Sequence, residues 1–145
     1  MTKETHIEKI KAKTEAALQT TLFLAKNPEF CNIELEAIWT LVDTSIIPII
    51  TYGSETWTLT KREEEKINNI LINTLKRITQ MPTSTANECI LVETGYKNIT
   101  DMIEKKKVNY IYKILNYKKE SLMYKYLINN DDKWTKEAKQ LITKY

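Results

Sequence analysis

The sequence predicts an all-α fold, a single domain of six to seven helices joined by short connections. Turn-forming residues are scarce, with two glycines and three prolines in 145 residues, so few β-hairpins can be built. Apolar residues instead recur at helical spacing through most of the chain. The length suits one domain with one core.

The first helix is expected over residues 5–26, and the second over about residues 33–50. Asn27 precedes a proline and should end the first helix, because that position disfavours helical backbone. His6, the lone histidine, falls at the start of the first helix and is interpreted as solvated, since no neighbour could assist catalysis. Pro48 should kink or end the second helix, because it has no amide hydrogen to donate.

The densest apolar run, residues 46–57, lies at the end of that second helix. Gly53 can adopt the positive φ that a sharp turn needs. Tyr52 and Trp57 flank it with large apolar area, and Glu55 between them would need a donor if it were buried. The residues alone therefore predict a buried corner of the core, a helix end followed by a tight turn.

The third helix is expected from the capping-box pair Thr60 and Glu63 to about Thr79. Lys76 and Arg77 fall in its last turn, where cations suit the helix dipole. The same two side chains could also contact phosphate. Both interpretations remain open.

A short fourth helix should follow. Thr85 and Glu88 repeat the capping-box spacing at its start, and Gly95 should end it in the left-handed conformation. Cys89, which lies inside this helix, is expected to be an inert core thiol.

The fifth helix, from Asn98 or Thr100 to about Tyr117, mixes lysines with tyrosines. Lysines beside tyrosines can hold a phosphate backbone while the rings stack on bases or lie against sugars. A solvated face, with the tyrosines half in the core, explains the pattern equally well. The candidate binding residues are Lys105, Lys106, Lys107, Lys113, Tyr110 and Tyr112.

The last part predicts a short helix around residues 122–127 and another over residues 134–145, with apolar residues at i, i+4, i+7, i+8 and i+11. Asp131 and Asp132 invite comparison with the paired aspartates that bind two metal ions in polymerases. They lack flanking apolar strands, so Asp132 is expected to be the N-cap of the last helix.

Composition limits the class of function. A single histidine and two cysteines without CxxC spacing exclude a Cys/His zinc site and a Ser-His-Asp triad. The N-terminus lacks a signal peptide and no apolar run could span a bilayer, so an intracellular chain, cytoplasmic or nuclear, with no membrane partner is expected.

Charge is unevenly distributed along the chain. Residues 1–96 carry 10 Lys and Arg against 13 Asp and Glu, whereas residues 97–145 carry 12 Lys against 6 Asp and Glu. The basic C-terminal part is where a polyanion is expected to bind.

The segment IIPIITYGSETWTLTKREEEKINNILINTLKRITQMP, residues 46–82, resembles the segment after the polymerase core in reverse transcriptases of non-LTR (LINE-type) retrotransposons. The resemblance covers most of residues 5–117. The positions that match the family's P-x-L-x-YG-x-E-x-W-x-L stretch and the helices after it are Pro48, Ile50, Tyr52, Gly53, Glu55, Trp57, Leu59, Lys76, Arg77, Pro82, Leu91, Glu93 and Gly95.

This resemblance implies the thumb and adjoining connection of an RNA-directed DNA polymerase, which hold template–primer nucleic acid by its backbone. Residues 1–96 would supply the thumb-like helices and residues 97–145 a basic helical part. The implied partners are RNA or an RNA–DNA hybrid, and the palm domain of a parent polymerase. Lys76, Arg77 and the lysines of the fifth helix are the expected phosphate contacts.

The resemblance also implies that this chain alone is not catalytic. The palm's catalytic aspartate motif is missing from it, so we expect no catalytic residue, no metal or cofactor and no small-molecule substrate; Mg²⁺ would belong to the palm. A structural role at the turn is expected for Pro48, Tyr52, Gly53, Glu55 and Trp57. The alternatives are a helical protein–protein interaction module and a degenerate remnant that binds no nucleic acid.

Overall fold

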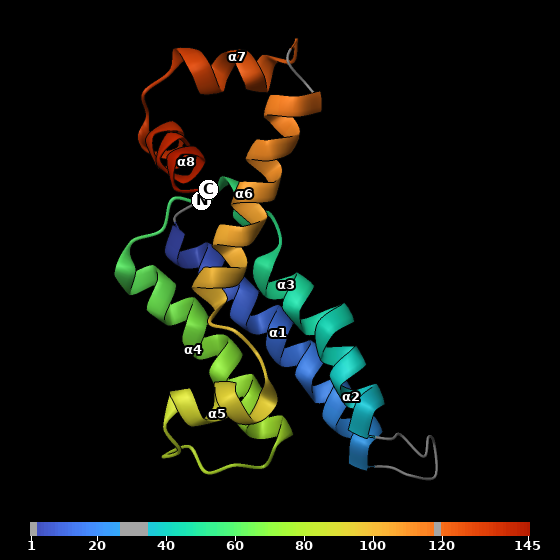
Figure 1. Ribbon diagram of the computed structural model, residues 1–145. Coiled ribbons are helices and arrows are strands. Elements are labelled where there is room, and N and C mark those ends of the chain that lie inside the picture. The colour runs from blue at the N-terminus through green and yellow to red at the C-terminus, as the bar shows by residue number, and fades with distance from the viewer. Residues whose placement is uncertain (1–2, 27–34, 118–119) are drawn as a thin grey trace. The chain divides into compact units, whose positions relative to one another are not determined.

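The computed structural model describes residues 3–26, 35–117 and 120–145, which contain helices and no strand (Figure 1). The predicted all-α class is confirmed, with seven helices in these residues when the continuous helix α2–η1–α3 is counted once. The predicted end of the first helix at Asn27 and Pro28 lies outside the described residues, as does Cys31. The elements are α1 (Lys3–Lys26), α2 (Leu35–Leu41), η1 (Val42–Ile46), α3 (Ile47–Thr51), η2 (Ser54–Thr56), α4 (Lys61–Ile78), α5 (Asn87–Thr94), α6 (Ile99–Tyr117), α7 (Leu122–Asn129) and α8 (Lys133–Lys144).

The chain divides into two compact units. Unit 1 comprises residues 1–52 and 61–99, and so contains α1 to α3, α4 and α5. Unit 2 comprises residues 53–60 and 100–145, and contains η2, nearly all of α6, and α7 and α8. Residues 53–60 are therefore in the same unit as helices that begin about forty residues later in the chain. The sequence does not indicate this association.

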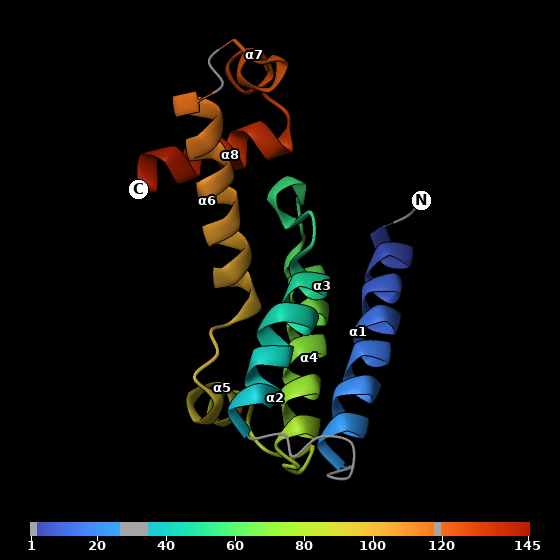
Figure 2. The same cartoon turned by 90° about the vertical axis from the view of Figure 1, so that its right-hand side faces the viewer.

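Unit 1 is built around α4, which packs against α1, α3 and α5 (Figure 2). Because α4 has neighbours on several sides, it buries a wide apolar stripe that includes Ile67, Leu71, Ile72 and Leu75. The buried apolar side chains of unit 1 are Ile7, Ile10, Leu18, Val42, Ile46, Ile50, Ile67, Leu71, Ile72, Leu75, Ile90 and Ile99.

The second helix continues past Pro48 to Thr51, so the proline does not end it. The irregularity lies just before the proline, in the π-helical turn η1, where the Ile47 amide donates to the Val42 carbonyl five residues back. Pro48 lies directly after this turn, near the start of α3 and within the continuous helix. The wider turn also relieves the clash between the proline ring and the carbonyl four residues before it.

The turn after α3 has the predicted left-handed glycine, since Gly53 has φ 70° and ψ 10°. The prediction of a buried corner is nevertheless wrong for Pro48, which is exposed, and for Tyr52, which is 82% exposed. Tyr52 has extended backbone, with φ −64° and ψ 124°. The helix therefore ends at Thr51. Tyr52 follows it with extended backbone, so its side chain is not on the side of the helix that buries Ile50 and Thr51.

The short helix α5 begins later than predicted. Its N-cap is Ala86, whose methyl side chain cannot accept a hydrogen bond. Thr85 lies in the preceding turn, where its amide donates to the Pro82 carbonyl at 3.0 Å. The predicted left-handed end at Gly95 is confirmed, with φ 72°. Cys89 is exposed and not a core thiol, because Ile90 is the residue that α5 buries.

Unit 2 has its own core, in which Trp134 of α8 is central. The ring of Trp134 meets Tyr110 edge-on at a centroid distance of 6.5 Å, and its Nε1 donates to the Glu55 carbonyl at 2.9 Å. This bond ties the segment after Gly53 to α8. The buried residues of this core are Ile111, Ile114, Leu127, Trp134 and Ala138.

The last helix differs from its prediction at the far end. Ile142 is 43% exposed, and Tyr145, which lies past the end of the helix, is 76% exposed. The predicted N-cap is confirmed, since the Asp132 carboxylate accepts from the Thr135 amide at 3.0 Å and from its hydroxyl at 2.6 Å.

Candidate nucleic-acid interface

One side of α6 is solvent-facing and carries both cations and an aromatic ring. We call it the α6 face and define it as Lys105, Asn109, Tyr112, Lys113 and Asn116, all exposed. These residues follow one another at steps of four, three, one and three, which keeps them on one side of a helix with 3.6 residues per turn. The opposite side of α6 is apolar, so packing fixes which side meets solvent.

Tyr112 presents an exposed ring on this face, at 60%. It lies seven residues from Lys105, on the same side of the helix, and the next residue, Lys113, is about 100° further around the axis. The side-chain amide of Asn116 donates to the Tyr112 carbonyl at 3.0 Å. The structure thus brings together three of the predicted binding residues, Lys105, Tyr112 and Lys113.

Two other predicted binding residues of α6 have structural contacts. Lys107 is 13% exposed and its Nζ lies 3.1 Å from the Glu137 carboxylate, an ion pair that joins α6 to α8. Tyr110 is half-buried against Trp134. Lys106, the remaining candidate on α6, is half-buried. The sequence alone did not separate these side chains from the exposed ones, because lysine and tyrosine occur on both sides of the helix.

Lys76 is not on the surface. It is 6% exposed, and its Nζ donates to the Thr83 carbonyl at 2.9 Å and to the Asn87 side-chain oxygen at 3.2 Å. The ammonium group therefore fastens the loop after α4 to the start of α5. We remove Lys76 from the candidate phosphate contacts because its donors point into unit 1.

Arg77 also has a partner within unit 1. One terminal nitrogen donates to both carboxylate oxygens of Glu15, at 2.6 Å each, which links α4 to α1. This hydrogen bond, with a second from Gln19, lowers the pKa of Glu15. The guanidinium is 42% exposed, but its charge is compensated. Arg77 belongs to unit 1, whereas the α6 face belongs to unit 2.

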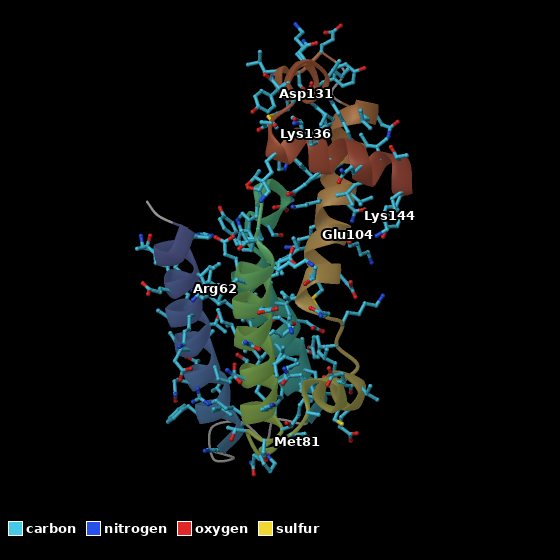
Figure 3. The ribbon with its side chains drawn as sticks, turned by 90° about the vertical axis from the view of Figure 1, so that its left-hand side faces the viewer. Arg62, Met81, Glu104, Asp131, Lys136 and Lys144 are labelled. Atoms are coloured by element: carbon cyan, nitrogen blue, oxygen red, sulfur yellow. The ribbon has the colours of Figure 1, made fainter. Side chains whose placement is uncertain are left out.

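Glu104 and Asp131, two acidic groups of unit 2, are paired with lysines outside the α6 face. Lys144 donates to Glu104 at 2.6 Å, and the Tyr145 hydroxyl donates to the same carboxylate oxygen at 3.0 Å (Figure 3). The bond from Lys144 lowers the pKa of Glu104. Asp131 is likewise paired with Lys139 at 2.7 Å. Asp101, an exposed carboxylate four residues before Lys105, lies on the same side of α6 as the α6 face.

Sequence reasoning missed Asn109 and Asn116, which complete the α6 face. Their spacing from Lys105, four and eleven residues, was the available signal, since both positions return to the same side of a helix. Amide side chains are ordinary donors to phosphate oxygens. Lysines of α7 and α8 are exposed in unit 2 as well: Lys125, Lys133 and Lys136.

Comparison with models of known protein families, with curated proteins and with solved structures finds no match to this chain. Within residues 3–26, 35–117 and 120–145, no three His, Cys, Asp or Glu side chains gather in a way that could hold a metal ion. In the same residues, no helix is long and apolar enough to cross a membrane.

Proposed function

We propose that this chain is a non-catalytic, nucleic-acid-binding helical module that corresponds to the thumb region of a non-LTR retrotransposon reverse transcriptase. The observation that carries the binding proposal is the α6 face, where Lys105 and Lys113 flank the exposed ring of Tyr112. The correspondence to a thumb rests on the sequence resemblance around Pro48, Gly53 and Trp57. Template–primer duplex is the proposed ligand.

The proposed contacts are made with the nucleic-acid backbone. Lys105 and Lys113 are eight residues apart, which is about 12 Å along a helix that rises about 1.5 Å per residue. Each ammonium can neutralise a phosphate and release a condensed counterion, which makes affinity fall with salt. Tyr112 between them offers a flat surface for a sugar or an unpaired base. Nothing in this set reads base edges, so we expect binding without sequence preference.

The test is fluorescence anisotropy of the whole chain with a labelled RNA–DNA hybrid, repeated from roughly 50 to 200 mM salt. The double variant Lys105→Ala/Lys113→Ala should bind more weakly, and its plot of log affinity against log salt should be shallower by about one per lysine removed. Lys133→Ala/Lys136→Ala removes the same charge from exposed positions on α8 and is the matched control.

Two outcomes would contradict the proposal. The first is no binding at low salt by a chain whose circular dichroism shows intact helices. The second is an equal loss of affinity in the two double variants, which would indicate attraction to net charge without a defined face.

A protein–protein module is the second candidate, because α7 exposes apolar side chains. Leu122 is 83% exposed, Ile128 51% and Tyr126 42%. Burial of such side chains by a protein partner is governed by apolar area and depends little on salt. Partner binding that survives 200 mM salt, in a chain that ignores the hybrid, would favour this function.

A further inference from the structure

A groove of about 650 Å³ lies within unit 1, between the N-terminal half of α1 and the helix formed by η1 and α3. Figure 2 shows α1 running beside α3, and the two helices are in contact. The groove spans positions 6–13 of α1 and 44–52 of the second helix, which is roughly two helical turns on each side at about 5.4 Å per turn.

The groove has an aliphatic part, formed by Ile10, Pro48 and Ile49, and its polar lining residues include His6, Thr44 and Ser45. Ile10 is buried at its base, and Pro48 and Ile49 form the wall on the α3 side. Tyr52 lies at the end of that wall and is 82% exposed. An exposed aromatic ring beside an aliphatic groove is the kind of surface that a partner side chain covers.

The rim on the α1 side is basic. Lys9 and Lys13, one turn apart, are both exposed and line the groove. No Asp or Glu is among the lining residues that the structure describes. Asp43, which precedes the lining stretch of η1, is occupied elsewhere, since it accepts a hydrogen bond from the Tyr96 hydroxyl at 2.6 Å.

We propose that this groove binds an acidic amphipathic helix of a partner protein. Two or three apolar side chains of that helix, spaced i, i+3 or i+4 and i+7, would cover Ile10, Ile49 and Tyr52. Its carboxylates would face Lys9 and Lys13, which sets the orientation of the helix and speeds encounter. The inference concerns unit 1 and is independent of the nucleic-acid proposal for α6.

The shape and chemistry of the groove favour a protein over a nucleic acid. Bases stack on flat aromatic faces, and the groove offers one exposed ring, Tyr52 at its end, beside the half-buried imidazole of His6. Aliphatic walls formed by Ile10, Pro48 and Ile49 match branched side chains such as leucine. A strand of nucleic acid would also leave the apolar floor uncovered.

The probe is a designed helical peptide with leucines at i, i+4 and i+7 and glutamates on the flanking positions. Titrated into the ¹⁵N-labelled chain, it should shift the amide signals of Ile10, Ile49 and Tyr52 and saturate. A scrambled peptide of the same composition should not do so. In the charge-reversal variant Lys9→Glu/Lys13→Glu, the dissociation constant should rise about tenfold or more.

Two further variants locate the site. Tyr52→Ala removes an exposed ring and should weaken the peptide without lowering the melting temperature. Lys26→Glu, at the exposed far end of α1, is the charge control and should bind the peptide normally. Three results would overturn the proposal: no saturable shift up to roughly millimolar peptide, equal binding of the scrambled peptide, or loss of RNA–DNA hybrid binding in Lys9→Glu/Lys13→Glu at unchanged peptide affinity.

Discussion

Lys76 and Arg77 are neighbours in the sequence, yet their charges serve different contacts. Lys76 is buried and holds a loop through two oxygen acceptors, whereas Arg77 is half-exposed and paired with Glu15. A helical step of about 100° is enough to move one residue from the surface to the interior. Both charges are already engaged within unit 1, so the presence of a cation at these positions does not by itself indicate a phosphate contact.

Lys76→Ala should destabilise the chain by about 1–3 kcal/mol, because the Thr83 carbonyl and the Asn87 side chain lose a charged donor. Urea unfolding followed by circular dichroism measures this loss. Arg77→Ala should cost about 1 kcal/mol or less, since its ion pair with Glu15 is exposed to solvent. Weaker hybrid binding by a Lys76→Ala chain of unchanged stability would restore Lys76 as a phosphate contact.

The turn after α3 requires left-handed backbone at Gly53, and the space around this residue does not otherwise limit substitution. An added Cβ would lie 4.0 Å from Trp57 Nε1, an ordinary contact, so strain in φ is the main cost of substitution. Gly53→Ala should cost about 1–2 kcal/mol, Gly53→Val more, and Gly53→Asn least, because asparagine tolerates this conformation. Thermal melts rank the three variants. Equal melting of wild type and Gly53→Val would contradict the structural role of this turn.

At the scale of elements, α8 shows how one side chain can start a helix and tie it to the rest of its unit. Asp132 accepts from both the amide and the hydroxyl of Thr135, and Tyr126 of α7 donates to the same carboxylate at 3.0 Å. Trp134 lies two residues after Asp132, and its Nε1 donates a hydrogen bond to the Glu55 carbonyl. The cap therefore sets where α8 begins, and that start places the indole in the core.

The cap predicts a specific dependence of stability on acid. The hydrogen bonds from Thr135 lower the pKa of Asp132 below its ordinary value of 3.8. A carboxyl with a depressed pKa in the folded state stabilises the fold fully above that ordinary value, and the stabilisation is lost as pH falls through the lower folded pKa. The melting temperature should thus fall in acid below about pH 4.

Asp132→Asn is the control for that prediction, because asparagine keeps an N-cap acceptor but does not titrate. Its melting temperature should depend less steeply on acid than that of the wild type, while Asp132→Ala should melt lower at every pH. Identical pH profiles for wild type and Asp132→Asn would assign the acid sensitivity to other carboxyls, such as Glu15 and Glu104, whose pKa values are also lowered.

At the scale of the whole chain, stability is expected to come from two sets of buried apolar side chains, one in each unit. Leu71 is fully buried in unit 1, whereas Leu122 of α7 is 83% exposed. Loss of the same atoms should therefore have very different costs. Leu71→Ala should destabilise by about 2–5 kcal/mol, and Leu122→Ala by less than about 0.5 kcal/mol.

Urea unfolding of the two leucine variants checks this contrast. A large loss in Leu122→Ala would indicate that α7 is covered by something, for instance a second copy of the chain. A dependence of its melting temperature on protein concentration would then be the signature of association.

Much of the fold could be predicted because helices leave local signals. The period of apolar residues located α1, α4 and α6 to within a few residues, and the scarcity of turn-forming residues disfavoured β-hairpins. Gly53 and Gly95 marked turns because their conformation is costly for other residues. The errors fall where the outcome depends on more than the local pattern: α5 begins at Asn87, after the predicted cap Thr85, and α4 packs against α1, α3 and α5.

The candidate site was less predictable, since a count of lysines and tyrosines does not say which of them meet solvent. Six positions on α6 were expected to bind, and the structure leaves Lys105, Tyr112 and Lys113 together on the exposed face. Lys107 instead pairs with Glu137, and Tyr110 packs against Trp134. These partners lie 30 and 24 residues further along the chain. His6, expected to be solvated, is half-buried.

The sequence by itself determined where most of the helices lie, which glycines turn left-handed, and that Asp132 begins α8, because each of these depends on interactions within a few residues. Only the tertiary structure decided that Lys76 is buried, that Tyr52 is exposed, and that the segment after Gly53 belongs with α8. Those outcomes depend on which helix packs against which, and the free energy of burial is gained between residues far apart in the chain.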